Sequence, residues 1–198
     1  MSGEGRSRRR VDLLEALRRL ATEGGRESAM AVGRFLGHHT EVEEAWLLDE
    51  PDAAAVARMA GRPDQELVAV GMDLPEPLGG RLLLLMPAAE AERISQRLVP
   101  AAAAGSLDVE GESALVEMGN IAGSAFVSAL ARTVEGRLLH GVPRLTRGRV
   151  RACLDTLAPG AAGPALGVRF GWPETVGTLL LLPDPAGLDG LARMLGIP

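Results

Sequence analysis

The chain has 198 residues and a formal net charge of −5, and Cys153 is its only cysteine. That length suits one large domain or two small halves around a shared core. The acidic balance argues against nucleic acid or an anionic membrane as the main partner. The single cysteine excludes an intrachain disulfide and a cysteine-based structural zinc site. The apolar run Leu82–Met86 is too short to span a bilayer, so we expect a soluble, cytoplasmic protein without membrane insertion.

The N-terminal half is predicted to begin with a long helix and continue as strands. Residues 1–10 are rich in arginine and glycine and are expected to form a disordered basic tail. The helix that follows ends near Gly37. Alternating apolar residues predict a strand around Trp46, and the apolar run Leu67–Met72 predicts a buried one. The run Gly80–Pro87 is followed by a short helical stretch, Ala88–Leu98.

The C-terminal half repeats this order. A second long helix is expected over Glu112–Gly136. Alternation predicts strands over Val150–Leu154 and Leu166–Phe170. The run Gly177–Pro183 repeats the earlier Gly-x-Leu-Leu-Leu-Leu pattern and is again followed by a helical stretch, Asp184–Leu195.

The repeated order indicates an internal duplication. Gly80 and Gly177 lie 97 residues apart, and an offset of 98 residues overlays the ends of the two long helices. We therefore predict an α+β fold with two long helices packed on one side of an antiparallel sheet. It would be a single domain, 11–198, built of two repeats (about 11–99 and 106–197) related by a pseudo-twofold axis.

The second long helix carries an apolar and a polar stripe. At 100° per residue the two stripes lie about opposite each other, so the apolar stripe should face the core and the polar stripe should face outward. Asn120 belongs to the polar stripe and is the only asparagine of a chain that has no lysine. The apolar members are Leu115, Met118, Ala122, Ala125 and Ala129, and the polar members are Ser113, Glu117, Asn120 and Ser124.

A glutamate and an asparagine three residues apart on an exposed face can act on a phosphorylated partner. The carboxylate of Glu117 can pair with a lysine of that partner, and the amide of Asn120 can both donate to and accept from a water molecule. A water held in line with a phosphoryl group is positioned for hydrolysis. The helix offers no nucleophile and no metal cluster, so the phosphate and any metal would belong to the partner. Gly119 and Gly123, beside the stripe, fit either close packing against a neighbouring helix or access for a docked partner.

The segment around Asn120 resembles the signature of the CheC/CheX/FliY group of chemotaxis phosphatases. That signature is an Asp or Ser, three residues, a Glu, two residues, an Asn, then 22 residues and a Pro. Its four terms match Ser113, Glu117, Asn120 and Pro143. The resemblance extends from about Val11 to Ile197.

The resemblance implies a phosphatase that hydrolyses the phospho-aspartate of the response regulator CheY. Glu117 would dock on a lysine of CheY, and Asn120 would direct the attacking water. Ser113 and Pro143 would support the site. The resemblance implies no cofactor of the chain's own, since the divalent metal, Mg²⁺, belongs to CheY.

Members of the group often carry one site in each half, and the first site of this chain departs from the signature. The 98-residue offset places Glu15, Arg19, Thr22 and Ala45 at the four terms. Arg19 reverses the charge that would meet a lysine, and Thr22 lacks the amide. We expect the N-terminal site to be degenerate, which leaves one working site.

The duplicated architecture resembles CheC more than the shorter, dimeric CheX, so we expect a monomer. We also expect no extra C-terminal switch-binding domain of the kind that FliY carries. CheD, a receptor deamidase that CheC proteins bind, is a further candidate partner that no residue here identifies. The alternative is a non-catalytic interaction module that binds CheD or a receiver domain, because the altered first helix shows that this scaffold tolerates loss of a site.

Overall fold

The computed structural model describes residues 3–49, 54–55, 58, 64–100, 107–160, 163–172 and 175–197. The predicted boundary between the two repeats includes residues 101–106, which lie outside the described part. The elements follow in this order: α1 (Gly3–Leu36), β1 (Glu41–Leu48), β2 (Glu66–Leu74), β3 (Gly80–Pro87), α3 (Ala88–Leu98), α4 (Val109–Thr133), β4 (Arg144–Arg149), α5 (Val150–Leu157), β5 (Ala165–Trp172), β6 (Thr175–Leu182) and α6 (Pro185–Met194).

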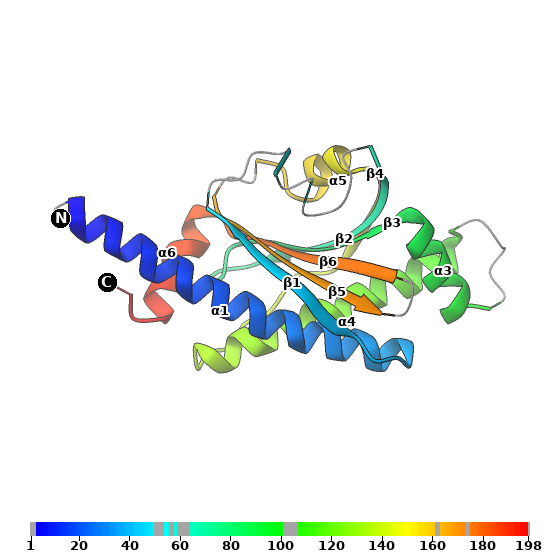
Figure 1. Ribbon diagram of the computed structural model, residues 1–198, viewed down its shortest axis with the longest axis horizontal. Coiled ribbons are helices and arrows are strands. Elements are labelled where there is room, and N and C mark those ends of the chain that lie inside the picture. The colour runs from blue at the N-terminus through cyan, green and yellow to red at the C-terminus, as the bar shows by residue number, and fades with distance from the viewer. Residues whose placement is uncertain are drawn as a thin grey trace.

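The described strands form one antiparallel sheet in the order β1-β5-β6-β3-β2-β4 (Figure 1). This confirms the predicted α+β fold. The two Leu-rich strands β3 and β6 lie side by side at its centre, where Leu83 pairs with Leu180. In the two halves β1 corresponds to β4, β2 to β5 and β3 to β6. Exchanging each strand with its counterpart gives the same order read from the opposite edge of the sheet. Leu83 and Leu180 are also 97 residues apart, which is the spacing of the sequence repeat. A pseudo-twofold axis between these two leucines would produce both features.

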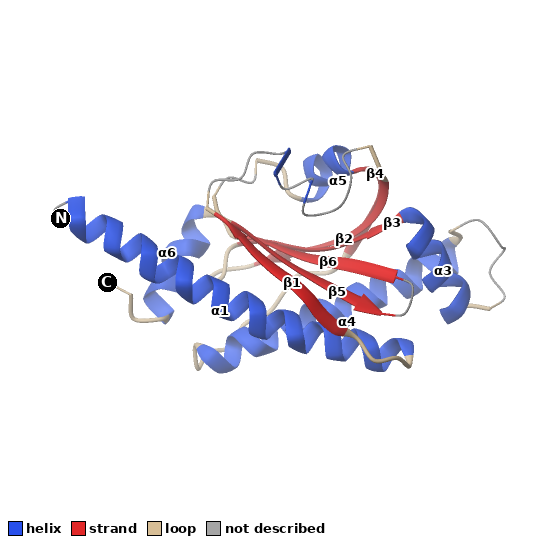
Figure 2. Ribbon diagram, in the orientation of Figure 1, coloured by secondary structure: helices blue, strands red, loops and turns tan. Residues whose placement is uncertain are grey.

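The long helices α1 and α4 pack side by side on one face of the sheet, as the sequence predicts, and α5 covers the other face (Figure 2). The buried side chains of β2 that face α4 include Val70 and Met72, and they share a core with Phe126 of α4. Ser28 of α1 donates a buried hydrogen bond of 2.8 Å to the carbonyl oxygen of Ala122 in α4. The helix pair is therefore fixed both by apolar packing and by a satisfied polar contact.

The predicted strand over Val150–Leu154 is wrong, because these residues begin helix α5. The buried side chains of α5 are Val150, Cys153, Leu154 and Leu157, which recur at helical spacing and pack on the sheet. The strand of this region is β4, immediately before the helix, and its free edge leaves most of its side chains exposed or half-buried. The alternation in Val150–Leu154 covers too few residues to distinguish the period of a strand from the period of a helix.

The basic N-terminal segment also differs from its expected disorder, since the helix extends back to Gly3. Arg9 pairs with Asp189 of α6 at 3.2 Å, and Arg10 pairs with Asp49 at 3.0 Å. These acidic partners lie far along the chain. The contacts therefore depend on tertiary structure that composition alone does not reveal.

Cys153 gives a pH-dependent prediction. Its side chain is 1% exposed, and burial, with a smaller effect of the Glu66 charge, raises the pKa of the thiol above its ordinary value. A thiol whose pKa is higher in the folded protein than in the unfolded chain contributes stability that is present below the unfolded pKa. That stability is lost as the pH rises through the folded pKa. We expect the free energy of unfolding, measured in urea, to fall above about pH 8.5 more steeply for the wild type than for Cys153→Ala. Equal slopes in that range would contradict this.

Candidate functional site

Helix α4 begins at a well-formed cap and lies flat on the sheet. Asp108 is the N-cap residue, and its carboxylate accepts a 2.8 Å hydrogen bond from the backbone N–H of Gly111. Such a cap stabilises a helix by about 1 kcal/mol. In the described part of the chain, α4 is the one helix long and apolar enough to cross a membrane by length and composition alone. Half of its most apolar window is buried against the protein's own sheet and helices, which accounts for its apolar composition.

The two glycines beside the polar stripe serve packing inside the protein. A Cβ atom on Gly119 would collide with the side chain of Val70, and one on Gly123 would collide with Met72. Both contacts are with β2, so the glycines let α4 approach the sheet closely. Of the two explanations that the sequence leaves open, close packing is therefore correct, although the partner is the sheet instead of a helix.

The polar stripe of α4 lies on the surface, as its helical spacing predicts. Ser113, Glu117 and Ser124 are exposed, and Asn120 is half-buried. The amide nitrogen of Asn120 lies 3.5 Å from a carboxylate oxygen of Glu117, which is a long contact for a hydrogen bond. The acid and the amide are thus adjacent and accessible, and the weak contact leaves the amide able to bind another group.

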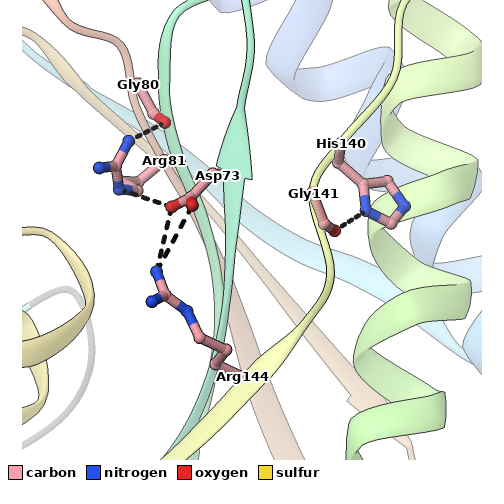
Figure 3. Close-up of polar contacts among 6 residues, drawn as sticks. All are labelled: Asp73, Gly80, Arg81, His140, Gly141 and Arg144. Atoms are coloured by element: carbon pink, nitrogen blue, oxygen red, sulfur yellow. Dashed lines mark hydrogen bonds and ion pairs between the residues drawn. The ribbon is translucent and has the colours of Figure 1, made fainter.

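The segment between α4 and β4 returns across the end of this stripe. The Nε2 atom of His140 is hydrogen-bonded to the Ser124 hydroxyl at 2.9 Å. Its Nδ1 atom lies 2.8 Å from the carbonyl oxygen of Gly141. Because only a protonated Nδ1 can donate to that carbonyl, a neutral ring would accept the Ser124 proton at Nε2. Figure 3 shows the ring turned toward α4. Pro143, the last term of the motif, is half-buried and directly precedes β4.

A charged cluster close to this segment lies on the other face of the sheet. Asp73 pairs with Arg81 at 3.0 Å and with Arg144 at 3.3 Å (Figure 3). Alternation along β2 places Asp73 on the same side as Leu67 and Ala69, which pack in the cluster beneath α5. The cluster therefore does not belong to the polar stripe of α4.

The corresponding surface of α1 lacks the chemistry of the stripe. Gly25 of α1 lies against Val168 of β5 as Gly123 lies against Met72, and these two glycines are 98 residues apart. This geometry supports the offset that aligns the two helices. The aligned positions hold Glu15 and Arg19, both exposed, and Thr22, half-buried.

The side chain of Thr22 is directed into its own helix. Its hydroxyl donates to the carbonyl oxygen of Arg18 at 2.9 Å, so α1 presents an arginine and a bonded hydroxyl where α4 presents a carboxylate and an amide. Across the described residues, no group of three histidine, cysteine, aspartate or glutamate side chains could hold a metal ion.

Comparison with known proteins places the fold. No family model and no curated protein matches the sequence. Among solved structures, FliY of Thermotoga maritima is similar with a TM-score of 0.67 and 11% identity, over 93% of this chain and 96% of that one. The FliM middle domain of H. pylori gives 0.62 and 10%, over 92% and 98%. A CheC-like superfamily protein from Shewanella sp. PV-4 gives 0.56 and 11%, over 82% and 95%.

The chain therefore has a CheC-like fold, which FliY and the FliM middle domain share. At 10–11% identity this likeness defines the fold alone, and the chemistry of the site depends on the side chains that the chain itself presents.

Proposed function

We propose that the protein is a phosphatase that accelerates hydrolysis of the phospho-aspartate of a CheY-like receiver domain in the cytoplasm. The observation that carries the proposal is the adjacent pair of Glu117 and Asn120 on the accessible face of α4. The same two residues are the central terms of the four-term motif. The CheC-like fold adds support, because it occurs in chemotaxis proteins.

The reaction needs positioning more than covalent help. Docking would bring the acyl phosphate of the receiver to the stripe, with Glu117 paired to a lysine of the receiver. The amide of Asn120 would hold a water molecule in line with the phosphorus atom. The water oxygen bonds to phosphorus as the bond from phosphorus to the aspartyl oxygen breaks, which leaves inorganic phosphate and a free carboxylate. The Mg²⁺ of the reaction would be that of the receiver, and it would offset the charge of the phosphoryl group.

A non-catalytic interaction module that binds a receiver or CheD is the second candidate. It is favoured by the altered surface of α1, which presents an arginine and a bonded hydroxyl in place of a carboxylate and an amide. The two functions differ in stoichiometry. A phosphatase releases many phosphates per molecule, whereas a binding module changes the lifetime of the phosphorylated receiver only at near-equimolar amounts.

Replacing Glu117 with glutamine tests the docking role. An exposed ion pair contributes about 0.2–1 kcal/mol, so the KM for the phosphorylated receiver should rise up to about fivefold. The value of kcat should change little, because the carboxylate does not touch the water. Steady-state phosphate release at several receiver concentrations measures both constants.

The matched control is Glu110→Gln, which removes the same charge from an exposed position in the first turn of α4. It should leave the KM nearly unchanged. Since salt screens exposed charges, the wild-type KM should also rise with ionic strength more than that of Glu117→Gln. Equal KM values for the two variants would remove Glu117 from the docking contact.

A further inference from the structure

Exposed apolar side chains concentrate next to the polar stripe. Val142 is 84% exposed and Leu139 is 58% exposed, and both lie in the short segment between α4 and β4. This segment, residues 138–143, also contains His140 and Pro143 and is called the return segment below. Val11, Met30 and Val109 are also exposed in the described part of the chain, and they lie on helices.

The return segment is held at several points, although it has no regular secondary structure. Leu138 is buried at its start. The backbone N–H of Gly141 donates a 2.7 Å hydrogen bond to the carbonyl oxygen of Asp73 in β2. This bond extends the contact of β2 with the chain to residues that precede β4. A Cβ atom on Gly141 would lie 3.3 Å from the Cβ of Asp73, so the glycine allows this close approach. The two apolar side chains are thus displayed outward from an anchored backbone.

His140 ties this segment to the helix that carries Glu117 and Asn120. Its partner Ser124 lies one helical turn beyond Asn120, on the same stripe. The segment that carries the two apolar side chains is therefore joined to the helix of the candidate site at this point. Arg137 directly precedes the segment and is exposed. A partner that docks here meets apolar surface beside this arginine, which is favourable for a surface that carries a phosphoryl group.

We propose that Leu139 and Val142 form the apolar part of the docking surface for the phosphorylated receiver domain, and that His140 is a positioning residue that holds them. This inference rests on the proposed function and names a further contact of the same site. Glu117 and Asn120 alone would present a small, polar contact. A specific complex also needs a central apolar contact from which water is excluded.

The test uses a receiver domain loaded with beryllofluoride, a stable mimic of the phosphoryl group, so that binding is measured without turnover. Val142→Ser and Leu139→Ser should each raise the Kd about tenfold, as expected for loss of one buried aliphatic contact. Val11→Ser is the matched control, because it makes the same change at an exposed position on α1, and it should leave the Kd unchanged. Steady-state assays should show a higher KM and a nearly unchanged kcat for the two variants of the return segment.

The role of His140 is tested by a double-mutant cycle with Ser124. His140→Ala and Ser124→Ala should each raise the Kd about threefold, and the double variant should be no weaker than either single one. Additive losses would show that His140 does not act through Ser124. Unfolding in urea should give similar midpoints for all variants, which separates a lost contact from a lost fold.

The outcomes separate this proposal from the proposed function. If the wild type binds the loaded receiver, if this binding depends on Val142, and if hydrolysis is never accelerated, then the docking surface is supported and the phosphatase activity is contradicted. If the wild type accelerates hydrolysis but Val142→Ser and Val11→Ser have equal Kd values, then only the docking surface is contradicted. Sedimentation of the free protein tests whether a second copy of the chain occupies this surface instead of the receiver. A wild-type dimer that Val142→Ser converts to a monomer would assign this surface to a second copy of the chain and overturn the proposal.

Discussion

Asn120→Ala should lower the kcat for phosphate release from the receiver about 100-fold, because the attacking water loses the group that orients it. The side chain is half-buried, and its contact with Glu117 is long at 3.5 Å. Removing it leaves no buried polar group unsatisfied, so the free energy of unfolding should change by less than about 0.5 kcal/mol. Binding of the beryllofluoride-loaded receiver should be nearly as tight as for the wild type.

Two further variants sharpen this prediction. Asn120→Gln keeps the amide but moves it by one methylene group, so a positioning role predicts a large loss for this variant too. Ser128→Ala makes a polar-to-alanine change at an exposed position two turns further along α4 and should retain full activity. A kcat for Asn120→Ala equal to that of the wild type would contradict the role of the amide.

Phe126→Ala should destabilise the protein by about 3–5 kcal/mol, which is a large share of the stability of an ordinary domain. The Phe126 ring is 1% exposed and lies where Gly24 of α1 leaves room for it. Loss of the ring opens a cavity between the two long helices, whose packing positions the stripe. Urea unfolding followed by circular dichroism measures the effect.

A second substitution tests whether this contact is the cause. A Cβ atom on Gly24 would lie 2.6 Å from the ring, so Gly24→Ala alone should destabilise by about 1–3 kcal/mol through overpacking. Once the ring is absent, the same change fills space and removes a helical glycine, which is favourable by up to about 1 kcal/mol. The double variant should therefore be more stable than Phe126→Ala. Simple additivity of the two losses would contradict the proposed contact.

The apolar periodicity predicted most of the fold because it depends on residues close together in the sequence, and the repeat showed the same order of elements in both halves. The two Leu-rich runs became the central strands β3 and β6, and the apolar stripe of the second long helix faces the sheet. Strand β4 was missed because its six residues include three arginines and one apolar side chain, Leu145. An edge strand exposed to solvent need not alternate, and arginines on it are tolerated.

The site was predictable in part for a related reason. Glu117 and Asn120 share one helix, so their spacing fixes their common face, and the lone asparagine is conspicuous in this composition. His140 could not be predicted in this way. Its contact with Ser124 exists only because the chain leaves α4, turns and returns beside it to enter β4. The ion pairs of Arg9 and Arg10 likewise join residues that only the tertiary structure brings together.

The most direct test is the time course of phosphate release from a phosphorylated CheY-like receiver, with this protein present far below the molar concentration of the receiver. Wild-type protein should release many phosphates per molecule, and Asn120→Ala should leave the decay at the receiver's spontaneous rate. Equal time courses for the two proteins, or an effect that needs equimolar amounts, would contradict catalysis by the α4 surface.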